Sequence, residues 1–524
     1  MALSALVAAV PLAVLLLLMG VLRKSGAISA AWGLASAACL AVLVWRMPIK
    51  LAGLSMAFGF VYALWPIMWI VSTALWLYNL SVDTGKFDLL RRWMASHASG
   101  DKCIQAVLVA FCFGALLEGT AGFGAPVAVA AYLLVALGLS ARQAVKLALI
   151  ANTAPVAFGG LGIPIVALAG VTGLDQMKLS AMVGRQLPFL SLLLPSYLVW
   201  VLAGWRGLKA TWPATLVGGM SFALAQFAVS NFWGPYAADI IAALASIGAL
   251  VLFLQIWRPE TSESSEPSAQ VSPPPSLEMK LSPGNAIAAW FPWLLLSGVM
   301  VGWSYFRLFQ KGQLARPVPY LHNAIFISLY QKPYAAVYQF QPLAAGTAAL
   351  VATILTALVF RCPKGVLIKS GVKTLRQLAL PGLTVGQIVA LAYLYNYSGM
   401  AYTLGAALAT LGGLFPLVSG FLGWVACFLT GSDTASNLLF GNLQVAAGHQ
   451  IGVSPILLAA TNSSGAVTGK MISPQNIAVG VTTVGLIGKE GEILRSTFWH
   501  SLTLALWLSL LAFAQAYWLK WMIP

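Results

Sequence analysis

The feature that most constrains this chain is its shortage of charge: 8% of its 524 residues are charged, while 60% are hydrophobic. A soluble domain carries roughly a quarter of charged residues, so this chain cannot cover a water-facing surface of its size. Its apolar residues gather in runs whose length approaches the about 20 residues that cross a bilayer. We therefore predict an all-α polytopic membrane protein with about 12–14 transmembrane helices, because helices satisfy their own backbone hydrogen bonds in lipid.

The basic residues indicate the orientation of these helices. Lys and Arg exceed Asp and Glu by 29 to 13, which gives a net charge of +16. In a membrane protein such an excess is typical of cytoplasmic loops, so we expect a lipid bilayer around the chain and no nucleic-acid partner. Residues 361–378 hold five basic and no acidic residues, which predicts a cytoplasmic loop. The first apolar run, Ser4–Leu22, ends at a basic pair, which predicts an N-terminus outside the cytoplasm.

A change of composition divides the chain. Residues 258–283 are rich in Ser, Pro and Glu, and such a segment buries too little apolar area to order itself. We predict a disordered cytoplasmic linker there, between a first membrane half at 1–257 and a second at 284–524.

Helix-breaking sequence interrupts the apolar runs at four places. Backbone without regular structure is tolerated at membrane depth only where it lines a cavity or packs within protein. The stretches are LLEGTAGFGAPVA (116–128), ANTAPVAFGGLGIPIVA (151–167), LTGSDTASNLLFGN (429–442) and TNSSGAVTGKMISPQN (461–476). An alternative is that their Gly and Pro residues only allow helices to pack closely.

These stretches form two matching pairs. Each half has an acid among small residues, Glu118 and Asp433, and then an asparagine, Asn152 and Asn462. Each asparagine is followed by a proline twelve residues later. Paired interrupted segments indicate a secondary transporter with its site between two structural repeats.

The two acids are candidates for coupling transport to protons. A carboxylate at bilayer depth costs about 2.5–3.5 kcal/mol on the insertion scale and marks a functional site. Burial favours its neutral form, so Glu118 or Asp433 could carry a proton near neutral pH. The alternative is a structural carboxylate that caps a half-helix or pairs with a buried arginine.

Other polar residues are candidates for binding an anionic substrate. Backbone N–H groups at half-helix N-termini bind anions. Four candidates would flank such ends: Asn152, Thr153, Asn462 and Ser463. Lys470 and Arg185 could add positive charge, or could instead extend to the membrane surface. The candidate substrate-binding residues are Asn152, Thr153, Asn462, Ser463, Lys470, Arg185 and Asn396.

Other functional classes find less support. The glycine-rich stretches lack the strand–helix context of a dinucleotide site, and HExxH, CxxC and P-loop motifs are missing. We therefore expect no enzymatic activity, no metal site and no cofactor. A channel would need pore-lining rings, which two asymmetric repeats in one chain do not supply.

Several long motifs resemble those of the bacterial L-lactate permease family. They are FGALLEGTAGFGAPVA, IANTAPVAFGGLGIP, VGRQLPF, FLGWVACFLTGSDTASN and GKMISPQNIAV, followed by GLIGKE. The resemblance extends over nearly the whole chain. It implies proton-coupled uptake of L-lactate and related 2-hydroxymonocarboxylates, such as D-lactate and glycolate, across a bacterial inner membrane. It also implies two inverted repeats with hairpins that enter the membrane without crossing it.

Together, these observations predict a symporter that works by alternating access. A small monocarboxylate would dock at the broken segments, and a proton on Glu118 or Asp433 would neutralise it. Sodium coupling stays open as an alternative, because hydroxyl and carbonyl oxygens beside unwound helix could hold a hard cation.

Overall fold

A computed structural model describes residues 2–97, 101–122, 124–257, 282–327 and 332–524. The predicted linker at 258–283 thus lies almost wholly outside the described residues. The helices of the first half are α1 (Ala2–Leu16), α2 (Gly26–Leu43), α3 (Ile49–Tyr62), α4 (Trp69–Asp83), α5 (Lys86–His97), α6 (Lys102–Gln105), α7 (Gly114–Thr120), α8 (Ala125–Ala136), α9 (Ala141–Ala151), α10 (Gly159–Thr172), α11 (Gln176–Val183), α12 (Leu187–Phe232) and α13 (Ala238–Ile256).

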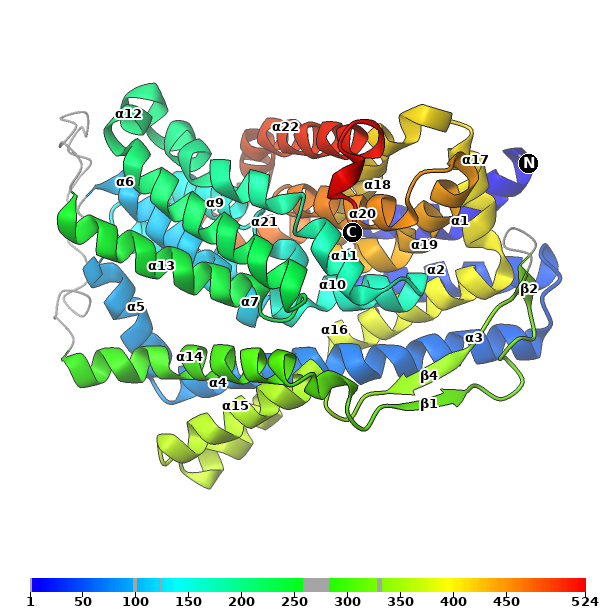
Figure 1. The fold of residues 1–524 in the computed structure, drawn as a ribbon, viewed down its shortest axis with the longest axis horizontal. Coiled ribbons are helices and arrows are strands. Elements are labelled where there is room, and N and C mark those ends of the chain that lie inside the picture. The colour runs from blue at the N-terminus through cyan, green and yellow to red at the C-terminus, as the bar shows by residue number, and fades with distance from the viewer. Residues whose placement is uncertain (1, 98–100, 123, 258–281, 328–331) are drawn as a thin grey trace.

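The second half is also helical, with one small β region. Its helices are α14 (Pro283–Tyr305), α15 (Ala345–Val359), α16 (Lys364–Ser398), α17 (Met400–Ala409), α18 (Phe415–Thr430), α19 (Asp433–Ile451), α20 (Pro455–Lys470), α21 (Pro474–Thr483) and α22 (Glu490–Tyr517). Its strands are β1 (Leu314–Pro317), β2 (Phe326–Ile327), β3 (Lys332–Pro333) and β4 (Val337–Phe340), which pair antiparallel as β1–β4 and β2–β3. Figure 1 shows this β region beside α3, outside the helical body.

The all-α membrane class is confirmed. Ten helical runs in the described residues are long and apolar enough to cross a membrane, or eleven with the bent pair Ala141–Ala151 and Val156–Thr172. The expectation of 12–14 counted the run Gln176–Phe232 as two segments. In the structure α12 changes direction at Gly204, whose backbone leaves the helical region. Three shorter apolar helices, α8, α15 and α17, fall below the length of a span.

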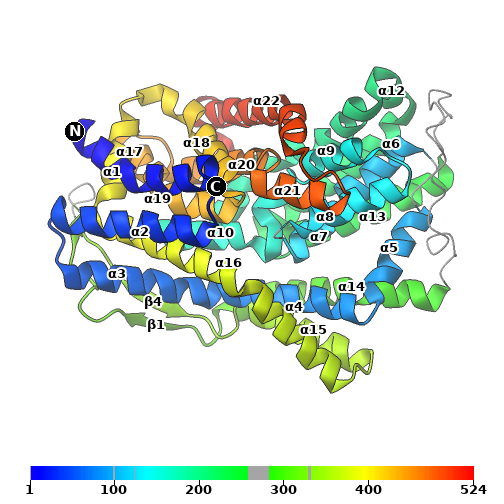
Figure 2. The ribbon, with the colours of Figure 1, turned by 180° about the vertical axis from the view of Figure 1, so that it is seen from behind.

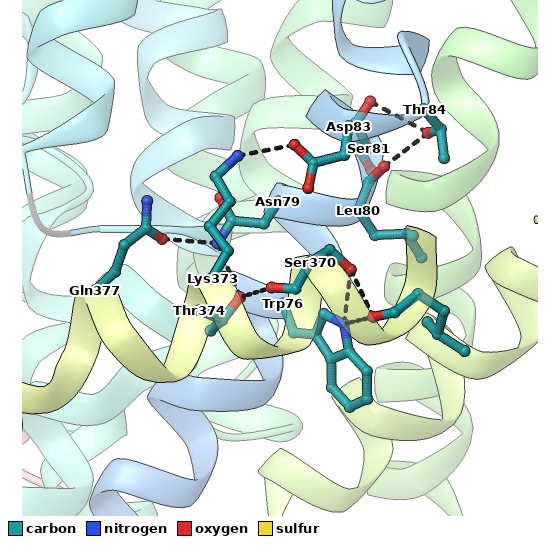
Figure 3. A network of polar contacts seen from close by, with 11 residues as sticks. Trp76, Asn79, Leu80, Ser81, Asp83, Thr84, Ser370, Lys373, Thr374 and Gln377 are labelled. Atoms are coloured by element: carbon teal, nitrogen blue, oxygen red, sulfur yellow. Dashed lines mark hydrogen bonds and ion pairs between the residues drawn. The ribbon is translucent and has the colours of Figure 1, made fainter. Parts of the chain in front are cut away.

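Long helices from the two halves lie side by side. Figures 1 and 2 show α3 and α4 along one edge of the molecule, with α16 crossing beside them. Figure 3 shows the polar contacts that join α4 to α16. Asn79 donates from Nδ2 to Thr374 Oγ1 (2.8 Å) and Gln377 Oε1 (2.7 Å), and Lys373 pairs with Asp83 at 2.8 Å. These contacts fix the register of the two helices, because buried polar groups need partners.

Two features of the first half have a counterpart in the second. Ile49–Asp83 and Lys364–Ser398 are both 35-residue runs, and each precedes a pair of interrupted helices. The breaks fall between α7 and α8, between α9 and α10, between α18 and α19, and between α20 and α21. The two-repeat arrangement stays a prediction, consistent with this order.

Just after the break between α9 and α10, the first residues of α10 form a left-handed turn. Gly160, Leu161 and Gly162 have φ of 51°, 61° and 72°. Glycine adopts such angles readily, whereas a side chain usually does not. A Cβ at Gly162 would also lie 2.7 Å from the Pro235 carbonyl oxygen. The GGLG sequence therefore lets this segment turn tightly against the chain before α13.

Candidate functional site

The four breaks surround one cavity of about 350 Å³. Its wall includes residues from both halves, together with one face of α16 and the start of α2. The lining residues nearest the breaks are Glu118, Gly122, Gly124, Gly159, Gly160, Thr430, Gly431, Ser432, Asp433, Lys470, Gln475 and Asn476. Interrupted helices thus meet around a space, which is where unwound backbone is tolerated within a membrane.

Three helices begin at this cavity. α8 starts after Gly124, α19 after Ser432 and α21 after Ser473. The two serine hydroxyls cap their own helices, but Gly124 has no side chain with which to cap α8. The first N–H groups of a helix lack intrahelical partners and carry the positive end of its dipole. These helix starts therefore favour an anion in the cavity.

A buried ion pair connects the two halves at the cavity wall. Lys470, the last residue of α20, places Nζ 2.7 Å from Oε1 of Glu118, near the end of α7. The two side chains are only 9% and 4% exposed. Asn152, which ends α9, donates from Nδ2 to the other Glu118 oxygen at 2.9 Å. Residues separated by 352 positions are thus in direct contact, and both carboxylate oxygens have a partner.

Asp433 has a different environment. It opens α19 and lines the same cavity. Ser463 donates from Oγ to Asp433 Oδ2 at 2.8 Å, while Oδ1 has no partner among the described residues. Asp433 therefore offers an unoccupied acceptor, which can take a hydrogen bond or a proton.

Asn152 and Asn462 occupy different structural positions, although the sequence aligns them. Asn152 lies at a helix break, whereas Asn462 lies within the continuous helix α20. Asn462 donates to Asn437 Oδ1 at 3.0 Å, and Asn437 donates to the Pro164 carbonyl at 3.1 Å. Asn462 thus supports the packing of α19 and α20 behind the cavity, and does not line it.

The other candidates lie at varying distances from this cluster. Thr153 is buried beside Asn152, and its Oγ1 has no partner in the part of the chain that the structure describes. Asn396 donates to the Val171 carbonyl at 2.8 Å and holds the end of α10. Arg185 donates to Asn231 Oδ1 and to the Met522 carbonyl, both at 2.8 Å. The structure therefore brings Glu118, Asn152, Lys470, Asp433 and Ser463 together around the cavity and its wall, but places Asn396 and Arg185 elsewhere.

Sequence reasoning missed one buried acid, Asp239. It lies in the first turn of α13 and is 1% exposed. The sequence places it directly before an apolar run, a position that is equally typical of a loop residue. Attention to acids at the edge of an apolar run would have found it. The buried charged residues among those described are Glu118, Asp239, Asp433 and Lys470, which is three carboxyl groups and one ammonium group.

Comparison with known proteins agrees with the motifs. Residues 4–519 match the family model described as L-lactate permease. The chain is 44% identical to glycolate permease GlcA of Escherichia coli (strain K12), over 98% of this chain and 96% of that protein. It is 43% identical to L-lactate permease of Salmonella typhimurium, over 100% and 97%. It is 42% identical to L-lactate permease of Bacillus subtilis, again over 100% and 97%.

Proposed function

Because this chain belongs to the L-lactate permease family, it is a lactate or glycolate transporter and not an enzyme, and we propose that it is a proton symporter. Its substrates would be 2-hydroxymonocarboxylates: L-lactate, with D-lactate and glycolate as related substrates. The observation that supports this proposal is the buried contact between Lys470 and Glu118 at the wall of the cavity.

The proposed coupling is an exchange of partners at Lys470. In the structure its ammonium group binds Glu118. A substrate carboxylate that enters the cavity competes for the same group. Glu118 would then be a buried carboxylate without a counter-charge, which costs several kcal/mol. Taking up a proton removes that cost, so one proton enters with each anion.

Neighbouring groups support this exchange. Asn152 orients Glu118 by donating a hydrogen bond to Oε2 of that carboxylate. The N-termini of α8, α19 and α21 favour the substrate anion. Asp433, held by Ser463, is the second candidate for the proton, because no described residue occupies its Oδ1. Thr153 lies next to Asn152 and is available for a polar contact. Asn462, Asn396 and Arg185 have protein partners, so the proposal gives them no substrate contact.

The test is uptake of labelled L-lactate into proteoliposomes under an inward proton gradient without sodium. We expect accumulation above the external concentration that a protonophore abolishes. A membrane potential alone should drive little uptake, because one proton with one monoanion carries no net charge. Accumulation that requires a sodium gradient would replace proton coupling with sodium coupling. Equilibration without accumulation under every gradient would indicate a channel.

Variants assign the coupling residue. Glu118→Gln should abolish accumulation driven by the proton gradient but retain exchange of labelled for unlabelled lactate, because glutamine resembles the protonated acid. Asp433→Asn is the parallel test of the second candidate. Unchanged proton-driven uptake in both variants would contradict the assignment.

We further propose a bacterial inner-membrane location with the N-terminus in the periplasm and the 258–283 linker in the cytoplasm. The β region would then face outward. In a variant without the five native cysteines, a single cysteine in place of the exposed Gln313 should react with an impermeant thiol reagent on intact spheroplasts. Reaction only after permeabilisation would reverse the orientation.

A further inference from the structure

Asp239 is a buried acid outside the proposed coupling pair, and it lies directly behind it. The residue is 1% exposed, and its Oδ1 accepts a hydrogen bond from Gln226 Nε2 at 3.1 Å. Its Oδ2 has no partner among the described residues. A Cβ at Gly119 would lie 3.0 Å from the Asp239 Cβ. The backbone that follows Glu118 therefore packs directly on Asp239.

Gln226 connects Asp239 to the helix break that holds Glu118. Its Nε2 lies 3.3 Å from the Ala154 carbonyl as well as 3.1 Å from Asp239 Oδ1. Ser191 donates to Gln226 Oε1 at 2.9 Å and fixes the orientation of the amide. Ala154 is two residues after Asn152, whose amide donates to Glu118. A change in the charge of Asp239 can thus affect Glu118 through the Gln226 side chain and the short turn from Asn152 to Ala154.

The balance of buried charge indicates the state of Asp239. Within the described residues, Lys470 is the one buried cation, and it is already paired with Glu118. An ionised Asp239 would be a buried carboxylate with a single neutral hydrogen-bond donor, and a buried charge without a counter-ion is costly. Ionisable residues at such positions in membrane proteins are functional sites by default.

We propose that Asp239 is a further proton-binding residue of this transporter, distinct from Glu118 and Asp433, which carries its proton on Oδ2 while the Asn152–Ala154 break holds Glu118 in place. This inference rests on the proposed function, because it concerns the same coupling site. Ionisation of Asp239 would add negative charge beside the pair. That charge would compete with the substrate for Lys470, so transport would decline at alkaline pH. Asp239 is a positioning residue and does not touch the substrate.

The surroundings of Asp239 leave few other groups to produce this effect. The other buried charged residues of the described chain are Glu118 on α7, Lys470 on α20 and Asp433 on α19, and Glu118 directly precedes the glycine that packs on Asp239. Gln226 on α12 is neutral, and α10 contains no titratable side chain. Cys112, on the segment before α7, is hydrogen-bonded to Ser246.

The first experiment measures the pH dependence of lactate exchange in Glu118→Gln, where the first coupling group no longer titrates. We expect exchange to fall about tenfold per pH unit above the midpoint of Asp239 ionisation. In Glu118→Gln/Asp239→Asn the alkaline decline should disappear, because asparagine mimics the protonated acid. Asp88→Asn, an exposed acid, is the matched control and should leave the profile unchanged. An identical decline with and without Asp239 would overturn the proposal.

A second variant tests the proposal if the Asp239→Asn protein does not fold. Gln226→Leu, also in Glu118→Gln, removes the donor that stabilises ionised Asp239, so the alkaline decline should move to higher pH. No movement, or movement to lower pH, would contradict the inference.

A spectroscopic measurement separates this inference from the proposed function. The infrared spectrum of the purified protein at neutral pH should contain a C=O stretch of a protonated carboxyl group that Asp239→Asn removes. Loss of this band would support the inference even if Glu118→Gln showed no exchange. The lack of exchange would count only against the proposed function. A band unchanged by the substitution would overturn the inference, whatever the transport data.

Discussion

Replacing Lys470 by methionine most directly perturbs the proposed coupling. Methionine keeps much of the length and apolar volume of the side chain but removes its charge. The proposal gives Lys470 two partners in turn, Glu118 in the empty transporter and the substrate carboxylate in the loaded one. The substitution should therefore weaken substrate binding and also leave Glu118 without its counter-charge.

The structure sets the magnitude of both effects. The paired side chains are 9% and 4% exposed and their atoms are 2.7 Å apart, so water screens the pair little. Truncating one partner of such a desolvated pair costs about 2–5 kcal/mol, which corresponds to a rise of about 30- to 5,000-fold in the Kd for lactate. The orphaned Glu118 should lower the free energy of unfolding by about 3–5 kcal/mol. That destabilisation should shrink as the pH falls, because protonation neutralises Glu118.

Two assays measure these effects: equilibrium binding of labelled lactate, and unfolding in detergent at several pH values. Lys489→Met is the matched control, because Lys489 also pairs with a glutamate, Glu492 at 3.0 Å, but its side chain is 49% exposed. Exposed pairs contribute little, so this control should bind lactate normally. A Kd for Lys470→Met equal to that of the control would refute the role of Lys470.

Three other substitutions test separate parts of the site. A Cβ at Gly159 would lie 2.6 Å from Glu118 Oε1, so Gly159→Ala should displace that carboxylate. Proton-driven uptake should fall at least about tenfold, or 1.4 kcal/mol. Normal uptake would show that the position of this carboxylate does not limit coupling. Ser463→Ala removes the one hydrogen bond that Asp433 accepts from a described residue. This loss should lower the free energy of unfolding by about 1.5–3 kcal/mol if Asp433 is ionised, and by less if Asp433 holds a proton. Unfolding curves as a function of pH distinguish these two states. Arg185→Gln breaks the contact with the C-terminal segment, so the unfolding temperature should fall while the KM for lactate stays unchanged. A raised KM with a normal unfolding temperature would indicate that Arg185 contributes to substrate binding.

Matched controls exist for two of these changes. Gly248, on α13, has open space around the position that a Cβ would occupy, with nothing within 4 Å, so Gly248→Ala should preserve uptake. Ser221 donates to Val217 within its own helix, so Ser221→Ala should have little effect on stability. A strong effect of either control would indicate that the corresponding test reports general disturbance of the helices.

Much of the architecture could be predicted because the bilayer imposes simple rules. The shortage of charge required membrane helices, and glycine and proline marked places where helices break. An acid or lysine within an apolar stretch is costly, so Glu118, Asp433 and Lys470 stood out as candidates. These residues line one cavity in the structure.

The pairing of those residues could not be predicted, because it depends on how the halves pack. Glu118 and Lys470 are 352 positions apart, and linear spacing carries no information about such a contact. The twelve-residue spacing aligned Asn152 with Asn462, yet only Asn152 lies at a break. The burial of Asp239 could not be predicted from the sequence, because burial at the edge of an apolar run depends on neighbouring helices, here α7 and α12.

The most direct test of the central claim is the number of protons taken up when lactate binds to the purified protein. The heat of binding, measured by calorimetry in buffers of different ionisation enthalpy, gives this number. If the substrate displaces Glu118 from Lys470, the wild-type protein should take up close to one proton per lactate at a pH where Glu118 is ionised, and Glu118→Gln should take up none. Binding of lactate to the wild-type protein without proton uptake at any pH from 5 to 9, roughly the range over which a buried carboxyl can titrate, would contradict the account.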